Sequence, residues 1–122
     1  LLPPLAPYDE QIPITDYLEN APLAFGKQIG RTDCRQAAIC VLAEAHRNPE
    51  LYARMAQAVY LPRIGLILQA FKRAQQNAAF DRKVDIDIAI DQLFGAVWYK
   101  VLIRFETVNR AYIKKLVAQV LP

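Results

Sequence analysis

Few residues of this chain have the chemistry to bind a metal ion or to attack a substrate. The only histidine is His46, and the two cysteines are Cys34 and Cys40. The cysteines lie on what reads as one helix, where their side chains point in different directions and cannot easily form a local disulfide. A zinc site needs three or four converging ligands, and Glu44 lies on another face of that helix. We therefore expect no metal site and reduced thiols, as is usual in a cytoplasmic protein.

The sequence also shows no motif that is typical of a catalytic site. The chain has no glycine-rich phosphate loop, no nucleophile elbow and no second histidine, so we expect neither an enzyme nor a cofactor. His46 ends a predicted helix, where it either caps the helix dipole or titrates near neutral pH. Gly65 and Gly95 fall inside predicted helices, where glycine costs about 1 kcal/mol relative to alanine. Their presence predicts close packing against a neighbouring helix.

Composition and charge also indicate which class of protein this is. The 122 residues are 54% hydrophobic, which is slightly more than a soluble domain usually needs and indicates an interface or an internal cavity. Fifteen Lys and Arg are interspersed with twelve Asp and Glu, which is typical of a solvated surface and not of a DNA-binding face. The set of basic residues that comes nearest to a DNA-binding patch is widely spaced: Arg104, Arg110, Lys114 and Lys115. No stretch is long enough for a membrane span and no signal peptide is visible, so we expect no membrane association and a cytoplasmic location.

The elements that must position any site are helices. Four prolines within residues 1–13 predict an extended arm or linker, and residues 14–122 read as one helical domain. The first two helices are expected over residues 15–30 and 32–47. Thr15 is the expected N-cap of the first, and Pro22 should bend or split it near Leu18. The second helix carries an apolar, alanine-rich face: Ala37, Ala38, Val41, Leu42 and Ala45.

Three more helices complete the predicted all-α bundle of about five helices. Asn48, Pro49 and Glu50 combine a capping side chain, a proline at the first helical position and an acidic residue, and they predict a long helix to residue 76. Pro62 should kink this helix by leaving the Ala58 carbonyl without a partner. After a polar turn over residues 77–83, further helices are expected over residues 85–104 and 109–121.

The last two helices carry more apolar surface than a domain of this size needs for its own core. We expect them to pair antiparallel and to dock onto a second copy, because a two-fold homodimer is the commonest way to cover such a surface. A monomeric bundle that buries both faces internally is the alternative. The expected dimer contacts are Ile90, Leu93, Val97, Val101, Ile113, Leu116, Val117 and Val120.

Several segments resemble the C-terminal domain of TetR/AcrR-family transcriptional regulators. The similar segments are Asn48-Pro49-Glu50-Leu51, Tyr60-Leu61-Pro62-Arg63, residues 85–102 around Leu93-Phe94-Gly95-Ala96-Val97-Trp98, and residues 108–121. The resemblance implies a bacterial transcriptional regulator that acts as a repressor, and whose last two helices form a four-helix bundle with those of a second subunit. It also implies a pocket for a small apolar effector among the central helices. In the family an N-terminal helix-turn-helix domain, which this chain lacks, contacts the DNA.

The residues expected to line an effector pocket combine aromatic area with a few polar tips. They come from two predicted helices: Tyr52, Met55, Tyr60, Ile64, Phe71, Phe94, Trp98 and Tyr99. Aromatic residues at helical spacing are equally consistent with ordinary core packing. The function implied is allosteric control of DNA binding by the missing domain. The alternative is a free-standing helical ligand-binding or scaffolding dimer with no role on DNA.

Overall fold

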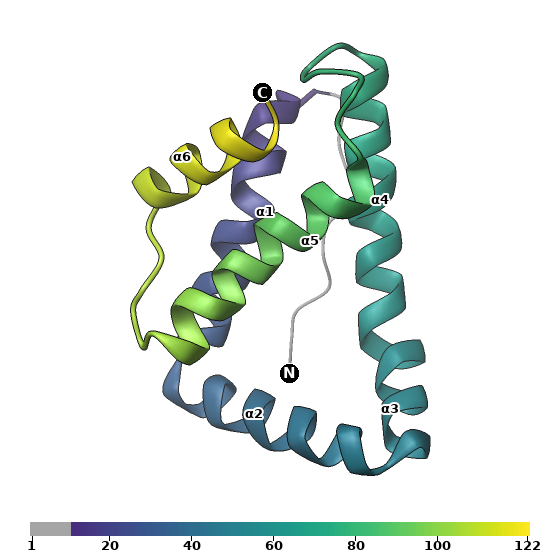
Figure 1. Ribbon diagram of the computed structural model, residues 1–122, viewed down its shortest axis with the longest axis vertical. Coiled ribbons are helices and arrows are strands. Elements are labelled where there is room, and N and C mark those ends of the chain that lie inside the picture. Colours follow the sequence, from purple (N-terminus) through teal and green to yellow (C-terminus); the bar gives the residue numbers. More distant parts are fainter. Residues whose placement is uncertain (1–10) are drawn as a thin grey trace.

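The chain folds into helices connected by short turns (Figure 1). The computed structural model describes residues 11–122, except for the side chains of Ile14, Thr15, Val59 and Tyr60. The elements are α1 (Ile14–Ile29), α2 (Thr32–Arg47), α3 (Pro49–Met55), η1 (Ala56–Tyr60), α4 (Leu61–Gln76), α5 (Ile86–Trp98), η2 (Tyr99–Ile103) and α6 (Arg110–Val120). The segments η1 and η2 are π-helical turns that continue their neighbours, so the chain has five helical runs within the described part. The all-α prediction is confirmed, whereas most of the proline-rich arm lies outside the described residues.

Three helix starts follow directly from local capping. The side chains of Asn48, Asp85 and Asn109 each accept a hydrogen bond from the backbone N–H three residues later, at 3.2, 3.1 and 2.9 Å. Each bond satisfies a donor that the first turn of a helix leaves unpaired. The predicted cap at Thr15 was wrong, because α1 begins at Ile14 and the N-cap position belongs to Pro13.

The two helical prolines have different effects. Pro22 lies within α1, which continues past it to Ile29, so the predicted split does not occur. Pro62 is the second residue of α4, just beyond η1, where the N–H of Leu61 donates to the carbonyl of Ala56 instead of the usual partner four residues back. A π-turn of this kind accommodates a helix that cannot keep its regular ladder near a proline. The predicted irregularity at Pro62 is therefore present.

The helices form a three-sided frame, which is visible in Figure 1. Helices α1 and α5 lie together on one side, and α6 packs against both. Helix α2 crosses below them and leads to the third side, which is formed by α3, η1 and α4. The upper part of α4 returns to contact α5, while α2 contacts mainly its sequence neighbours α1 and α3. Ala45 is the only residue of α2 that is buried.

Two hydrophobic clusters hold the frame together, and α5 contributes to both. The upper cluster joins α1, α4, α5, the 77–85 turn and the C-terminus: Leu18, Ile67, Phe71, Ala74, Phe80, Ala89, Ile90, Leu93 and Leu121. The lower cluster joins α1, α5, η2 and α6: Leu23, Ile29, Val97, Val101, Val108 and Ile113. Burying such side chains supplies the main driving force for the fold. No described helix is both long and apolar enough to cross a bilayer.

Close approach of the backbone occurs at a glycine that the sequence did not single out. A Cβ on Gly26 would overlap the side chain of Val108 and lie 3.1 Å from Val97 Cγ1. Gly26 thus lets α1 pack directly against α5 and the segment before α6. The close packing expected at Gly65 and Gly95 was wrong, because a Cβ at either position would meet no atom within 4 Å.

Candidate functional site

Three aromatic side chains meet where α1 packs against α5. The ring of Phe25 contacts those of Phe94 and Trp98 edge to face, with centroids 5.5 and 5.4 Å apart. All three are only half-buried, although each packs against one of the core clusters. Incomplete burial of three large rings leaves apolar surface that a ligand can cover. We call Phe25, Phe94 and Trp98 the aromatic trio.

The structure separates the residues predicted to line a pocket. Phe71 is fully buried in the upper cluster, so it serves the core. Tyr52 on α3 and Tyr99 on η2 are more than half exposed and face solvent. Met55 and Ile64 are half-buried, like the two trio members that were predicted, and Tyr60 has its side chain outside the described residues. Phe94 and Trp98 both contact Phe25, and Phe94 and Ile64 both pack against the upper cluster that contains Phe71.

That partner, Phe25, was missed by sequence reasoning, although a signal was present. Tyr17, Ala21 and Phe25 are spaced four residues apart and fall on one side of α1. Ala21 is buried and the two aromatic residues are half-buried. The expected pocket used only the helices from residue 48 onward, so it omitted this wall.

Helix α2 closes the lower end of the frame in Figure 1, and one side of it is turned away from solvent. Its less exposed positions recur at helical spacing: Cys34, Arg35, Ala38, Leu42 and Ala45. Ala37 and Val41, which were expected on the packed face, are exposed.

A polar pair links α1 and α4. Tyr17 on α1 and Arg63 on α4 interact electrostatically, and both side chains are half-buried. Burial raises the pKa of the Tyr17 hydroxyl, and the positive charge of Arg63 opposes that shift. Burial likewise lowers the pKa of the Arg63 guanidinium, which Tyr17 opposes. Arg63 nevertheless stays protonated, because arginine keeps its charge under all ordinary conditions.

The stripe expected at a dimer interface belongs to the core of this chain. Ile90, Leu93, Val97 and Val101 on α5 and η2, together with Ile113 on α6, are at most 4% exposed. The remaining three, Leu116, Val117 and Val120, are half-buried against the clusters. Side chains that are already covered offer little surface to a second copy. Both the contact residues and dimerisation itself stay predictions.

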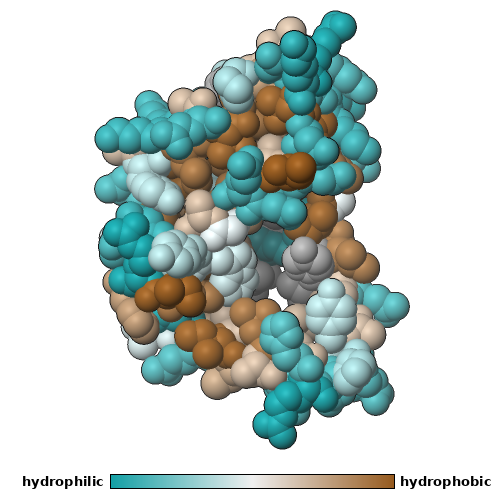
Figure 2. Space-filling model, in the orientation of Figure 1, coloured by the Kyte–Doolittle hydropathy of each residue, from teal (hydrophilic) through white to brown (hydrophobic). Residues whose placement is uncertain are grey.

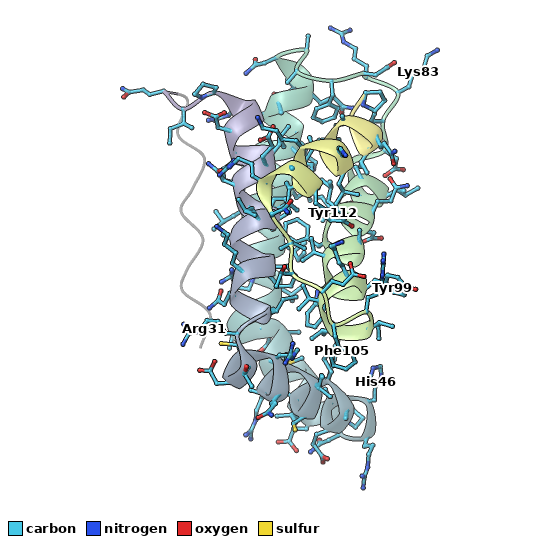
Figure 3. All side chains as sticks on the ribbon, turned by 90° about the vertical axis from the view of Figure 1, so that its left-hand side faces the viewer. Arg31, His46, Lys83, Tyr99, Phe105 and Tyr112 are labelled. Carbon is cyan, nitrogen blue, oxygen red and sulfur yellow. The ribbon has the colours of Figure 1, made fainter. Side chains whose placement is uncertain are left out.

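A different stripe of the same helix is exposed. Ile88, Tyr99 and Ile103 are 55, 57 and 65% exposed, and Gly95 falls on the same side of α5 and η2. Tyr99 projects outward in Figure 3, and hydrophobic surface lies over the lower end of α5 in Figure 2. We call Ile88, Gly95, Tyr99 and Ile103 the outer stripe.

Ion pairs stabilise the segment that connects η2 to α6. Lys100 Nζ lies 3.0 Å from Glu106 Oε2, and Arg104 contacts the other carboxylate oxygen at 2.7 Å. The ammonium of Lys100 also lies 4.3 Å from the ring centre of Tyr112. Next to this group, Phe105 takes a φ of 55° and its ring lies 5.7 Å from the guanidinium of Arg35 on α2. The connection is visible in Figure 3.

Glu106→Gln should weaken this connection at neutral pH but not in acid. The hydrogen bond from Lys100, helped by the charges of Arg104 and Lys100, lowers the pKa of Glu106. A lowered folded-state pKa stabilises the fold above the unfolded value of about 4.3. That contribution disappears as the pH falls through the lower folded-state value. Urea unfolding of both proteins between pH 7 and pH 3 checks this, and a difference that persists unchanged in acid would contradict it.

Other features of the described residues show no chemistry of their own. Residues 11–122 bring together no group of three or more His, Cys, Asp or Glu that could hold a metal ion. A shallow depression of about 170 Å³ lies beside the α2–α3 turn, lined by Asn48, Glu50, Leu51 and Arg54. It is remote in sequence from the aromatic trio and has no aromatic wall. His46 lies exposed near the same turn, as Figure 3 shows.

The geometry is that of an all-α domain with a half-covered aromatic interior and an exposed apolar stripe. A family model described as the tetracycline repressor-like C-terminal domain matches residues 23–120. This match extends over most of the chain and includes the aromatic trio and the outer stripe. The chain therefore belongs to the family of tetracycline repressor-like C-terminal domains. No curated protein and no solved structure gave a match.

Proposed function

We propose that this chain is the effector-binding and dimerisation part of a bacterial TetR-type transcriptional repressor. A small, mainly apolar effector binds inside the frame, and a DNA-binding domain outside this chain responds. The aromatic trio is the observation that carries the proposal. Its three rings come from two helices and remain half-buried, and placing a ligand on them removes apolar area from water.

The arrangement of helices suggests how effector binding would be transmitted to a DNA-binding domain. One side of the site is formed by α1 and α5, and α2 ties this side to α3 through contacts with its sequence neighbours. An effector that binds one spacing of these sides better than another shifts the equilibrium toward that spacing. In a dimer the shift changes the separation of two DNA-reading heads, which must lie about 34–36 Å apart to enter successive major grooves.

Dimerisation in this proposal uses the outer stripe. The stripe is apolar, and Gly95 allows another helix to approach closely because nothing lies near its Cβ position. In a two-fold dimer each copy presents the same surface to the other. The exposed residues Ala111 and Ala118 of α6 add small side chains at the pairing helices.

A ligand screen read by thermal unfolding tests effector binding. Apolar compounds that bind the aromatic trio should raise the melting temperature, since a ligand at about 100 times its dissociation constant stabilises a fold by about 2.7 kcal/mol. Trp98→Leu removes one ring and should lose most of that shift. Tyr52→Leu is the matched control, because Tyr52 lies exposed on α3, and it should keep the shift.

Two results would count against the proposal. A shift that Trp98→Leu retains in full would place binding away from the aromatic trio. Complete failure of varied apolar compounds to stabilise the protein would argue against effector binding itself. Because Trp98 is the only tryptophan, quenching of its fluorescence in the wild-type protein gives an independent reading of the same event.

A further inference from the structure

Phe105 has an unusual backbone conformation for an aromatic residue. It follows Arg104, the C-cap of η2, and its φ is 55°. Glycine is the usual residue in this left-handed region after a helix, and a residue with a Cβ adopts it at a cost in free energy. Burial does not offset that cost, because Phe105 is 72% exposed and belongs to neither hydrophobic cluster. Another contact of the ring must account for phenylalanine at this position.

The segment between η2 and α6 fixes the direction of the Phe105 ring. The N–H of Glu106 donates to the carbonyl of Lys100 at 3.0 Å, which closes the backbone around Phe105. The carboxylate of Glu106 also pairs with the side chains of Lys100 and Arg104. A backbone hydrogen bond and two ion pairs therefore hold the residue that carries the ring.

The ring of Phe105 lies against α2. The guanidinium carbon of Arg35 is 5.7 Å from the centre of this ring, which is within the range of a cation–π contact. Arg35 lies near the beginning of α2, on the side of the helix that is turned away from solvent. Figure 3 shows Phe105 at the end of η2 that is next to α2. The contact thus joins two segments that are far apart in the sequence.

Helix α2 is otherwise weakly attached. Its buried residue, Ala45, lies near its C-terminal end, and neither hydrophobic cluster includes a residue of α2. The helix contacts mainly α1 and α3, its neighbours in the sequence. Local opening of such a segment requires little free energy. A single side-chain contact near the beginning of α2 is therefore able to change how often this helix leaves its place.

We propose that Arg35 and Phe105 form a latch, which holds the N-terminal half of α2 against the segment between η2 and α6. While the latch is closed, the position of α2 follows that of α5 and α6. When the latch opens, α2 moves and the two clusters stay packed. This inference goes beyond the proposed function, because the latch lies outside the aromatic trio and the outer stripe and needs no bound effector.

Hydrogen exchange of the full chain, followed by mass spectrometry of peptides from α2 and α5, tests the latch. Arg35→Met removes the charge and keeps the helix propensity. It should speed exchange in α2 by about two- to fivefold, the range expected for an exposed cation–π contact. Phe105→Gly should speed exchange in α2 equally. Because glycine relieves the backbone strain, this variant should not lower the urea midpoint of the whole protein.

Further variants show whether the two residues act as a pair. In the double variant, α2 should exchange no faster than in either single variant, because one contact can be lost only once. Phe105→Tyr keeps an aromatic ring and should exchange like the wild type. Gln36→Met is the matched control for Arg35→Met, because Gln36 is exposed on α2 next to Arg35, and it should also exchange like the wild type.

Unchanged exchange of α2 in both single variants, or additive acceleration in the double variant, overturns the latch. Acceleration that extends equally to α5 also overturns it, because the ring would then stabilise the whole fold. Acceleration that is confined to α2 and is the same in both single variants and the double variant supports the latch. Since no ligand is used, failure of the latch leaves the proposed effector site and dimer interface standing.

Discussion

Gly26→Ala is expected to lower the free energy of unfolding by about 1–3 kcal/mol, the usual cost of forcing extra atoms into a packed core. The new Cβ would overlap the side chain of Val108, and Val97 Cγ1 would lie 3.1 Å away. Both neighbours are β-branched and buried, so neither can turn aside easily. The loss outweighs the gain of about 1 kcal/mol that alanine normally gives within a helix. Urea unfolding measures the difference.

Gly65→Ala is the matched control for this prediction. It also replaces a glycine within a helix, but the added Cβ would meet nothing within 4 Å. The helix-propensity gain should therefore appear alone, as a stabilisation of about 1 kcal/mol. If both substitutions stabilise the protein equally, α1 does not approach α5 and Val108 as closely as described.

Ile103→Glu combined with Tyr99→Glu is expected to convert a dimer into a monomer. Both side chains are more than half exposed on the outer stripe, so the folded monomer should tolerate the charges. In a two-fold interface each substitution acts twice, and unpaired carboxylates would be buried. We expect the dimer dissociation constant to rise at least about 100-fold, which corresponds to about 2.8 kcal/mol. Sedimentation equilibrium over a range of concentrations measures it.

Ile39→Glu tests whether the effect is specific to the outer stripe. Ile39 is 46% exposed on α2, away from the helices expected to pair. This variant should associate like the wild type, and all proteins should give the same helical circular dichroism signal. A wild-type chain that is monomeric at all concentrations, or a double variant that still dimerises, would refute the assignment of the interface.

The helices were predictable because their determinants are local. Asn48 and Asn109 cap the helices that follow them through contacts only three residues long. Pro62 disturbs its helix through the missing N–H of its own backbone. Such effects depend on sequence neighbours alone. The limits of the second and last helices were accordingly placed within about one residue of those observed.

The candidate site was less predictable because it depends on contacts between distant segments. Helix α5 is apolar on two sides, and the packing of α1 and α6 decides that Leu93 is buried while Ile88 is exposed. Phe25 gains its importance from Phe94 and Trp98, some seventy residues later. Gly26 likewise matters through Val108. The periodicity of hydrophobic residues shows which sides of a helix are apolar, but it does not show which other helix packs against each side.

Helix α2 has a single buried residue, Ala45, and contributes nothing to the two large clusters that α1, α4, α5 and α6 share. Its cohesion with the remainder is therefore weak, and local opening of such a segment requires far less free energy than global unfolding. Amide protons of α2 should consequently exchange sooner than those of α5. Helix α2 can therefore change its position while the two hydrophobic clusters stay packed, so α2 is a helix of the frame that deforms easily.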